Sequence, residues 1–277
     1  MGDILIVGKD DKNCFEIEQE VRAHGFRGKL TFEQDIAKEW LTLRGFDALI
    51  IDSSISADDQ QEMAEILWSR NQSAHLIVFD LSNQNGRQSQ HVRLSGADYI
   101  YGNKGMAHLK RLLERIRNQR PVLKNDFRIL VVEDLDSPRD IICFYLEGLG
   151  FSHIKGVASA KEAIAELTGS PEGYHCVLTD VRMPEMTGRD LIEYMRSNQK
   201  LKAMPIIVLT AIGTIENLVE CLKAGASGFL VKPPKKDDIL RELSRAFRIV
   251  AGGENPRLAQ PEEADEMREA LIQKGVA

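Results

Sequence analysis

Several features of exported, membrane-bound or DNA-binding proteins are scarce or missing in this chain. Its 277 residues include four cysteines, widely spaced and without a C-x-x-C pair, which favours reduced thiols in the cytoplasm over disulfides or a zinc site. No apolar run approaches the roughly 18 residues that a membrane helix needs. No basic stretch precedes an apolar core near Met1, so we expect no signal peptide. The net charge of −6 gives no overall reason to expect DNA binding.

The composition is that of a globular protein with room for two domains. Hydrophobic residues make up 43% of the chain and charged residues 28%. Along the first half, short apolar runs typical of buried strands alternate with segments of helical spacing. Strands separated by helices of this length predict a parallel sheet with right-handed crossovers. The expected strands are residues 4–7, 30–32, 48–51, 75–79 and 98–101.

The same pattern repeats in the second half, where strands are expected at residues 129–132, 154–157, 175–179, 205–209 and 228–231. We therefore expect two flavodoxin-like (βα)5 domains, each a doubly wound parallel sheet of five strands in the order 2-1-3-4-5. The predicted boundaries are a first domain at 1–119, a linker at 120–126, a second domain at 127–250 and a frayed or docked tail at 251–277.

The predicted strand ends of the second copy bring charged and polar side chains together. The first and third strands are neighbours in such a sheet, so Glu133 and Asp134 should lie beside Asp180. Three crowded carboxylates repel one another by several kcal/mol at an effective dielectric of about 20. Mg²⁺, which binds carboxylate, water and phosphate oxygens, best offsets that repulsion. Lys232 adds a positive charge and Thr210 a hydroxyl group.

This arrangement favours phosphoryl chemistry at Asp180. An ionised Asp180 can attack phosphorus as a nucleophile. Mg²⁺ and Lys232 would neutralise the equatorial oxygens of the transferring group, which is most of what phosphoryl transfer requires. A lone aspartate at a strand end is more typical of a helix cap or a loop, so the prediction depends on the four partners.

Five short motifs stand in order at these strand ends: Val132-Glu133-Asp134, Asp180-Val181-Arg182-Met183-Pro184, Gly188, Leu209-Thr210-Ala211 and Lys232-Pro233. Together they resemble the receiver domain of two-component response regulators of the chemotaxis-regulator type, over residues 127–250. The resemblance implies that Asp134 and Asp180 ligate Mg²⁺ by side chain and Arg182 by its backbone carbonyl, with Glu133 assisting directly or through water. Phe229 matches the family's aromatic switch position, and its ring would turn inward when Thr210 moves toward the phosphate. Without that role, Phe229 is a half-buried strand residue.

The first copy aligns as a receiver that has lost its chemistry, a pseudo-receiver. Asp52 stands where Asp180 does, but the acidic pair is replaced and Lys9 could form an ion pair with Asp52 or Asp80. Metal binding would return only if Asp10 and Asp11 took the place of the acidic pair. The alignment matches Glu133 and Asp134 with Gly8 and Lys9, Thr210 with Asp80, Phe229 with Ile100, Lys232 with Asn103 or Lys104, and Met183-Pro184 with Ile55-Ser56.

The resemblance implies a cytoplasmic phosphorelay protein without a DNA-binding output. It would take phosphoryl from a sensor histidine kinase or a phosphotransfer protein, hydrolyse it slowly, and signal to a downstream protein by contacts of the fourth helix, last strand and last helix. The first copy would dock, dimerise or restrain the second, and residues 235–238 would form a loop or part of a partner face. One alternative is an aspartate-based phosphatase, although Arg182 stands where such enzymes place a general acid. The other is a structural interaction protein, which suits the first copy better.

Overall fold

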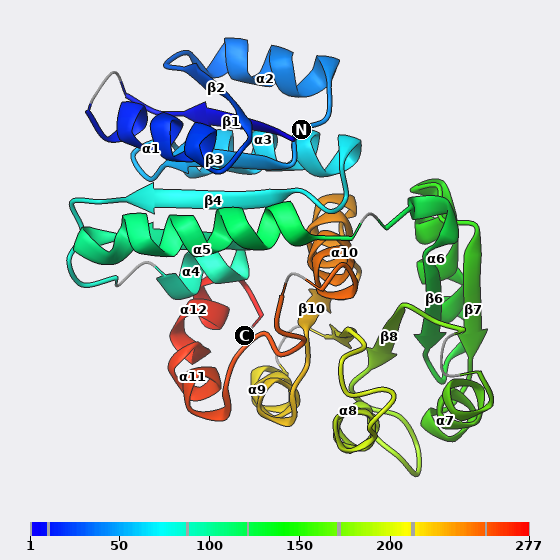
Figure 1. Cartoon of the computed structure of the whole chain (residues 1–277). Helices are drawn as coiled ribbons and strands as arrows, with labels where there is room; N and C mark the ends of the chain where they lie inside the picture. The colour runs from blue at the N-terminus through cyan, green and yellow to red at the C-terminus, as the bar shows by residue number, and fades with distance from the viewer. Residues whose placement is uncertain are drawn as a thin grey trace. The chain divides into compact units, whose positions relative to one another are not determined.

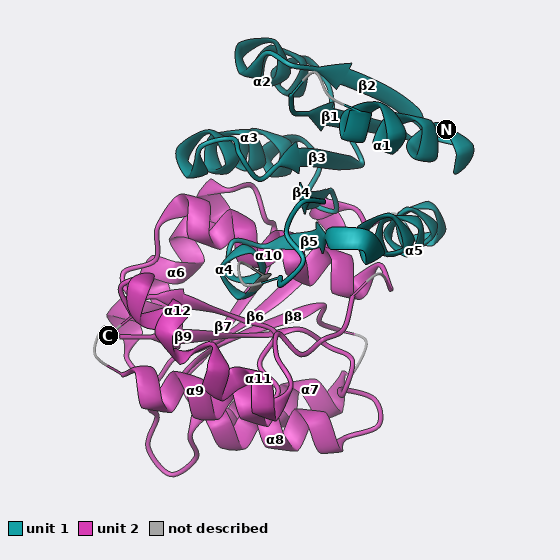
Figure 2. Ribbon diagram, turned by 90° about the vertical axis from the view of Figure 1, so that its left-hand side faces the viewer, with its two compact units in different colours: residues 1–120 teal, residues 121–277 magenta. Residues whose placement is uncertain are grey.

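The chain forms two compact units, each built around its own sheet. The computed structural model describes residues 2–9, 12–86, 89–120, 122–170, 173–211, 214–252 and 254–276. The units are Met1–Arg120 and Pro121–Ala277, drawn in different colours in Figure 2. Asp10 and Asp11, the residues considered above as substitute metal ligands, lie outside the described residues.

The sheet of the first unit has the strand order β2-β1-β3-β4-β5, and its strand pairs are parallel (Figure 1). The strands are β1 (Asp3–Val7), β2 (Arg27–Thr31), β3 (Ala48–Asp52), β4 (His75–Asp80) and β5 (Ala97–Tyr101). The helices are α1 (Lys12–Ala23), α2 (Gln34–Leu43), α3 (Ala57–Arg70), α4 (Ser89–Leu94) and α5 (Gly105–Asn118), with a 3₁₀ turn, η1 (Gly102–Lys104), before α5.

The central strands of this sheet are continuous apolar runs because helices cover both faces. On β3, Leu49 and Ile51 belong to the core beneath α2 and α3, whereas Ile50 belongs to the core beneath α1 and α5. The second strand is the one that we placed wrongly, since it begins at Arg27 and ends at Thr31. It lies at the edge of the sheet and is only partly buried, so it has no apolar run to reveal it.

The second unit repeats this arrangement, with the strand order β10-β9-β8-β6-β7 and parallel pairing. The strands are β6 (Arg128–Val132), β7 (His153–Val157), β8 (Cys176–Asp180), β9 (Ile206–Thr210) and β10 (Gly228–Val231). The helices are α6 (Asp136–Gly148), α7 (Ala160–Gly169), α8 (Gly188–Ser197), α9 (Ile215–Ala224) and α10 (Lys236–Val250), after a 3₁₀ turn, η2 (Lys124–Asp126). The predicted tandem of doubly wound sheets in the order 2-1-3-4-5 is confirmed.

The last residues of the chain also belong to the second unit. They form two short helices, α11 (Pro261–Glu266) and α12 (Arg268–Gln273), which pack against α9 (Figure 1). Within the described ranges, no helix combines the length and the apolar character that crossing a membrane would require. None of the four cysteines, all of which are described, forms a disulfide.

Candidate functional site

Charged side chains from three strands meet at the carboxyl edge of the second sheet. Glu133 and Asp134 directly follow β6, Asp180 is the last residue of β8, and Lys232 directly follows β10. Because β6 and β8 pair directly, their ends place three carboxyl groups side by side. The carboxylate oxygens that Glu133, Asp134 and Asp180 offer all lie within 4.8 Å of one another. The sequence-based prediction had named each of these residues, and the fold brings them together.

Lys232 holds two of the three carboxylates. Its Nζ donates to Asp180 Oδ1 at 2.5 Å and to Glu133 Oε2 at 2.6 Å. Burial disfavours the ammonium group, but the hydrogen bonds to Asp180 and Glu133 outweigh it and raise the pKa of Lys232. Burial also raises the pKa of Glu133, whose side chain is 1% exposed, with the hydrogen bond from Lys232 acting in the opposite direction. The cluster therefore combines a strongly held cation with excess negative charge.

The loop after Asp180 is built around the close approach of two backbone segments. The N–H group of Arg182 donates to Asp180 Oδ2 at 2.9 Å, so this loop fixes the second oxygen of the carboxylate. A Cβ atom on residue 188 would lie 2.1 Å from the carbonyl oxygen of Asp180, and only glycine avoids that collision. Thr187 and Asp190 form a capping box that begins α8 at this point. The Arg182 carbonyl as a metal ligand stays a prediction.

Thr210, the last residue of β9, is fully buried, and its hydroxyl group is engaged with a second threonine. Thr210 Oγ1 lies 2.7 Å from Thr214 Oγ1, and Thr214 Oγ1 donates to the carbonyl oxygen of Ala211 at 2.6 Å. Thr210 Oγ1 also lies 3.4 Å from the carbonyl oxygen of Ala211, and either hydroxyl group can donate in the bond between the two threonines. From the sequence we took Thr214 only as the cap of the following helix; it stands at that position, but its side chain makes no capping bond, and its bond to Thr210 was not predicted.

Phe229 is buried rather than half-buried as we expected, with 1% of its surface exposed. It lies opposite Val208 on the neighbouring strand, and Nζ of Lys274 lies 6.0 Å from the centroid of its ring. Lys232, three residues on, is joined to Pro233 by a cis peptide bond. The Phe229 ring is already buried in this structure, and its movement during signalling stays a prediction.

Arg139 is a further residue near the site that the sequence did not indicate. Its guanidinium group donates to the carbonyl oxygen of Glu133 at 2.8 Å and also bonds to Asp136. These contacts fasten the start of α6 to the residue that carries the buried carboxylate. Nothing in the sequence distinguishes this arginine from others on helix surfaces.

The sequence profile of the response regulator receiver domain matches residues 129–244, the part of the chain that holds this cluster. Two-component response regulator ORR11 of Oryza sativa subsp. indica is 35% identical over 119 residues, which cover 43% of this chain and 80% of that protein. The chain belongs to the response regulator receiver family. ORR5 of Oryza sativa subsp. japonica is 33% identical over 120 residues, 43% of this chain and 88% of that protein.

Several solved structures are similar to part of the chain. The chemotaxis protein CheY4 of Vibrio cholerae shares 30% sequence identity, over 43% of this chain and 98% of that chain, with a TM-score of 0.40. A response regulator from Chloroflexus aurantiacus shares 26%, over 44% of this chain and 97% of that chain, with a TM-score of 0.41. The receiver family consists of phosphoryl-accepting signalling domains rather than classical enzymes.

The first unit has a receiver-like sheet, and its register shows which residues stand at the positions of the site. Gly8 and Lys9 follow β1 where Glu133 and Asp134 follow β6, and Asp52 ends β3 where Asp180 ends β8. A Cβ atom on Gly8 would lie 2.5 Å from Sγ of Cys14, so the position of the buried glutamate is closed. The three equivalents of Glu133, Asp134 and Asp180 therefore include a single carboxylate.

Two of our alignments to this unit are wrong. The pairing of β4 with β5 places Tyr99, not Ile100, at the position of Phe229, and Gly102, not Asn103 or Lys104, at the position of Lys232. Hydrogen bonding between strands fixes this register, whereas the sequence alone allowed a shift of one or two residues.

The polar groups of the first unit bond to one another rather than to Lys9. Asp80 Oδ1 accepts from Ser82 Oγ at 2.7 Å, and the hydroxyl group of Tyr99 lies 3.4 Å from Asp80 Oδ2. Asp52 Oδ1 accepts from the N–H group of Ser54 at 2.7 Å. In the part of the chain that the structure describes, Lys9 is exposed and no ion pair joins it to Asp52 or Asp80, contrary to our expectation.

Proposed function

We propose that Asp180 is the phosphoryl acceptor of a response regulator and that Mg²⁺ assists the transfer. The observation that carries this proposal is the double contact of Lys232 with Asp180 and Glu133, beside a third carboxylate. Three carboxylates and one ammonium group leave net negative charge at the site, which a hard divalent cation would balance. The donor set consists of oxygens alone and so fits Mg²⁺. Asp134 and Asp180 would hold the ion, with Glu133 and the Arg182 carbonyl assisting.

The residues of the chain divide the work of transfer between them. An oxygen of Asp180 forms a bond to phosphorus while the P–N bond of a donor phosphohistidine breaks and the imidazole leaves. Lys232, already 2.5 Å from Asp180, lies where it can neutralise an oxygen of the arriving phosphoryl group. The hydroxyl group of Thr210 can supply a hydrogen bond to another oxygen after it leaves Thr214. Bound Mg²⁺ would add Lewis-acid stabilisation of the same charge.

This proposal is tested by incubating the protein with acetyl phosphate and measuring the intact mass. With Mg²⁺ present we expect the addition of one phosphoryl group, which should be lost slowly by hydrolysis. Removal of the metal with a chelator should reduce uptake by at least about 100-fold, because the carboxylate cluster then repels the incoming phosphoryl anion. Uptake that does not depend on divalent metal would contradict the metal role, and no uptake at all would contradict the proposal.

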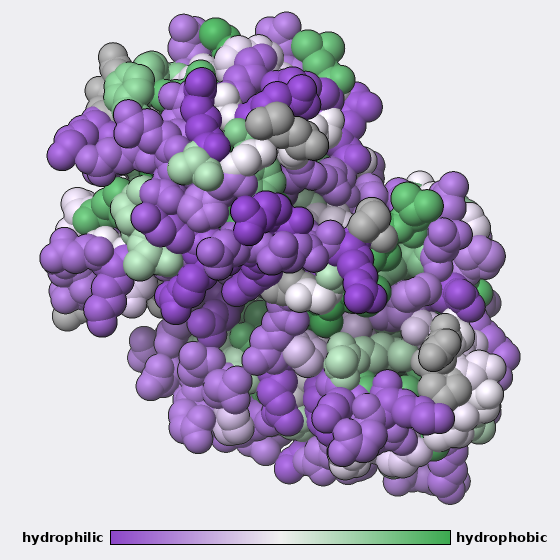
Figure 3. All heavy atoms as spheres, viewed as in Figure 1, coloured by the Kyte–Doolittle hydropathy of each residue, from purple (hydrophilic) through white to green (hydrophobic). Residues whose placement is uncertain are grey.

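The phosphoryl donor is proposed to be a helical histidine kinase or phosphotransfer domain that docks on α6. The first residues of this helix lie beside the acidic cluster, and its outer face carries exposed apolar side chains. Ile141, Phe144 and Tyr145 are 50%, 71% and 43% exposed, at the spacing of one helical face. In Figure 3, apolar side chains lie over the region where Figure 1 draws α6. An apolar surface next to the acceptor is suited to a protein donor.

We expect Phe144→Ala to slow transfer from a phosphorylated histidine-containing protein by about tenfold or more, since exposed aromatic residues often dominate binding energy. Uptake from acetyl phosphate should stay unchanged, because a small donor does not need the apolar surface. Leu43→Ala is the matched control, as Leu43 in the first unit is also 71% exposed. Equal slowing with both donors would show instead that Phe144 acts on the acceptor site itself.

The remaining parts of the proposal concern the first unit and the setting. Without the acidic pair and the lysine, the first unit would contribute by docking, by homodimer formation or by restraining the second. The output would be contact with a downstream protein, with no direct binding to DNA, and the site would work in the cytoplasm. The cysteines, none of which forms a disulfide, suit that compartment.

A further inference from the structure

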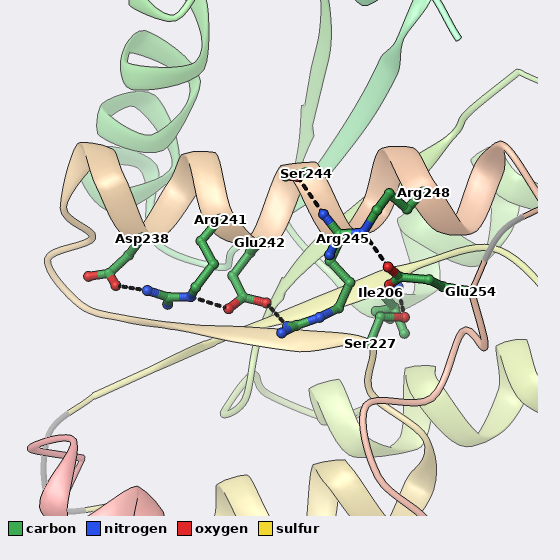
Figure 4. A network of polar contacts seen from close by, with 9 residues as sticks. All are labelled: Ile206, Ser227, Asp238, Arg241, Glu242, Ser244, Arg245, Arg248 and Glu254. Carbon is green, nitrogen blue, oxygen red and sulfur yellow. Dashed lines mark hydrogen bonds and ion pairs between the residues drawn. The ribbon is translucent and has the colours of Figure 1, made fainter. Parts of the chain in front are cut away.

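The segment that leads to the C-terminal helices is fixed to the second unit. Arg248, near the end of α10, bonds to the carboxylate of Glu254 and to the hydroxyl group of Ser244 (Figure 4). The N–H group of Leu258 donates to the carbonyl oxygen of Ala226 at 2.8 Å. Glu254 and Leu258, at the start of the C-terminal segment, are therefore both bonded to the body of the second unit.

A half-buried arginine reinforces this attachment. Arg196 of α8 donates to the carbonyl oxygens of Gly225 at 2.8 Å, Met204 at 2.8 Å and Pro256 at 3.4 Å. Burial lowers the pKa of its guanidinium group to about 10, and the hydrogen bonds to the carbonyl groups offset part of the lost solvation. We expect this connection to persist whatever happens at the acceptor site.

Helix α10 is held to its sheet by apolar side chains that belong to the same core. Asp238, Arg241, Glu242 and Arg245 form a continuous chain of ion pairs along it (Figure 4). The Glu242 carboxylate lies so close to β10 that a Cβ atom on Gly228 would be 1.9 Å from its Oε2. A small shift at the sheet edge is therefore not expected to release α10.

Helix α9 is held differently, because its outer surface is covered by α11 and α12. Asp265 bonds to Lys223 at the carboxyl end of α9 at 2.8 Å, and Arg268 bonds to Glu216 in its first turn. The apolar residues between and beyond these charges, Ala264, Met267 and Leu271, are all buried. This cover, residues 261–273, is an amphipathic segment. Its Asp265 and Arg268 lie opposite Lys223 and Glu216 of α9.

The first turn of α9 is also connected to the acceptor site. Thr214 is the residue before the helix, but its side chain makes no capping bond to the helix itself. Its hydroxyl group instead bonds to Thr210 at 2.7 Å and to Ala211. The position of the turn that contains Glu216 therefore depends on a bond that Thr210 would give up to reach a phosphoryl group.

We propose that residues 261–273 are an autoinhibitory cover on the outer face of α9, which detaches when Thr210 leaves Thr214 for a phosphoryl group on Asp180. This inference rests on the proposed function of Asp180. The cover would detach from the Glu216 end first, since the residues at its base are held by Arg248 and Arg196. A downstream partner would be an amphipathic helix that places a basic group at Glu216 and an acidic group at Lys223, as the cover does.

Amide hydrogen exchange of the full chain tests the proposal. With Mg²⁺ and beryllofluoride, we expect residues 261–273 to exchange at least about fivefold faster, which corresponds to the loss of one hydrogen bond. The α10 segment should not change. Thr214→Val, which removes the bond to Thr210 without any phosphoryl group, should speed the same segment. Thr168→Val is the matched control, because the hydroxyl group of Thr168 donates to backbone carbonyl groups of its own helix, α7.

The outcomes separate this proposal from the function on which it rests. Phosphoryl uptake by acetyl phosphate with no change in exchange at 261–273 would overturn the autoinhibitory role of the cover and leave the acceptor role intact. No uptake at Asp180 would overturn both. Arg268→Glu provides a test that needs no phosphoryl group, since it should loosen the cover and Glu216→Arg in the same chain should restore it. Failure of that restoration would show that the observed contact does not hold the cover.

Discussion

Replacing Asp180 with asparagine is expected to abolish phosphoryl uptake, whereas replacing Asp52 with asparagine should leave uptake at the wild-type level. The amide is neutral and is not a nucleophile for phosphorus, so Asp180→Asn removes the acceptor without changing its size. Asp52 ends the equivalent strand of the first sheet, but the positions corresponding to Glu133 and Lys232 are glycines there. A carboxylate without these partners has neither a metal site nor a cation to neutralise the transferring group.

The two substitutions form a matched pair, because each removes one negative charge from the last residue of a third strand. Intact mass after incubation with acetyl phosphate and Mg²⁺ measures both. Thermal unfolding of each variant should show that it is folded. Labelling of Asp180→Asn at half the wild-type level would mean that Asp52 is a second acceptor. Labelling of Asp180→Asn equal to wild type would mean that phosphorylation occurs elsewhere.

The candidate site could be predicted because its residues stand at strand ends. Apolar runs such as Ile129-Leu130-Val131-Val132 fix where a buried strand lies, and parallel strands deliver the following residues to one edge. That reasoning placed Asp134 beside Asp180 and Lys232, as the structure has them. It works for central strands because burial on both faces restricts their composition.

The same reasoning was less successful where burial does not restrict the sequence. The edge strand β2 contains Arg27 and Lys29, so its limits were wrong. On β5, hydropathy does not show whether Tyr99 or Ile100 corresponds to Phe229. The hydrogen-bonded register between β4 and β5 decides for Tyr99. The bond between Thr210 and Thr214 joins two side chains across a turn, and no composition or spacing rule reveals it.

The C-terminal segment shows the same limit at a larger scale. The spacing of apolar residues at 263–273 indicates an amphipathic segment, but a single amphipathic face does not identify the surface that covers it. The structure supplies that surface as α9, with Lys223 opposite Asp265 and Glu216 opposite Arg268. Because the amphipathic segment packs on α9 rather than on another domain, it covers the helix that begins directly after Thr214, which bonds to Thr210.

Replacing Lys232 with methionine is expected to damage both transfer and stability. Uptake from acetyl phosphate should slow by about 100-fold or more, because one of the groups that neutralise the transferring phosphoryl is lost. In metal-free solution the free energy of unfolding should fall by about 3 kcal/mol, since the buried carboxylate of Glu133 and that of Asp180 lose their shared cation. Methionine preserves the length and the apolar stem of lysine, so lost packing contributes little to this effect.

The metal and pH dependence of this variant separate electrostatics from packing. Mg²⁺ should restore part of the lost stability of Lys232→Met, because the ion replaces the missing positive charge among the carboxylates. The pKa of Lys232 is raised in the folded protein, so its contribution is fully present below the ordinary value of 10.5 and is lost as pH rises through the raised pKa. Wild type and variant should therefore differ most at neutral pH and converge only in strong alkali.

Denaturant unfolding with and without Mg²⁺ measures these differences, and Lys155→Met is the control. Lys155 forms an ion pair with Glu166 at 2.5 Å in the same unit, but its side chain is 51% exposed, against 24% for Lys232. Because solvent screens an exposed pair, the control should lose much less stability and should not respond to Mg²⁺. Equal losses in the two variants, or a loss in Lys232→Met that Mg²⁺ leaves unchanged, would mean that repulsion among Glu133, Asp134 and Asp180 does not govern this edge of the sheet.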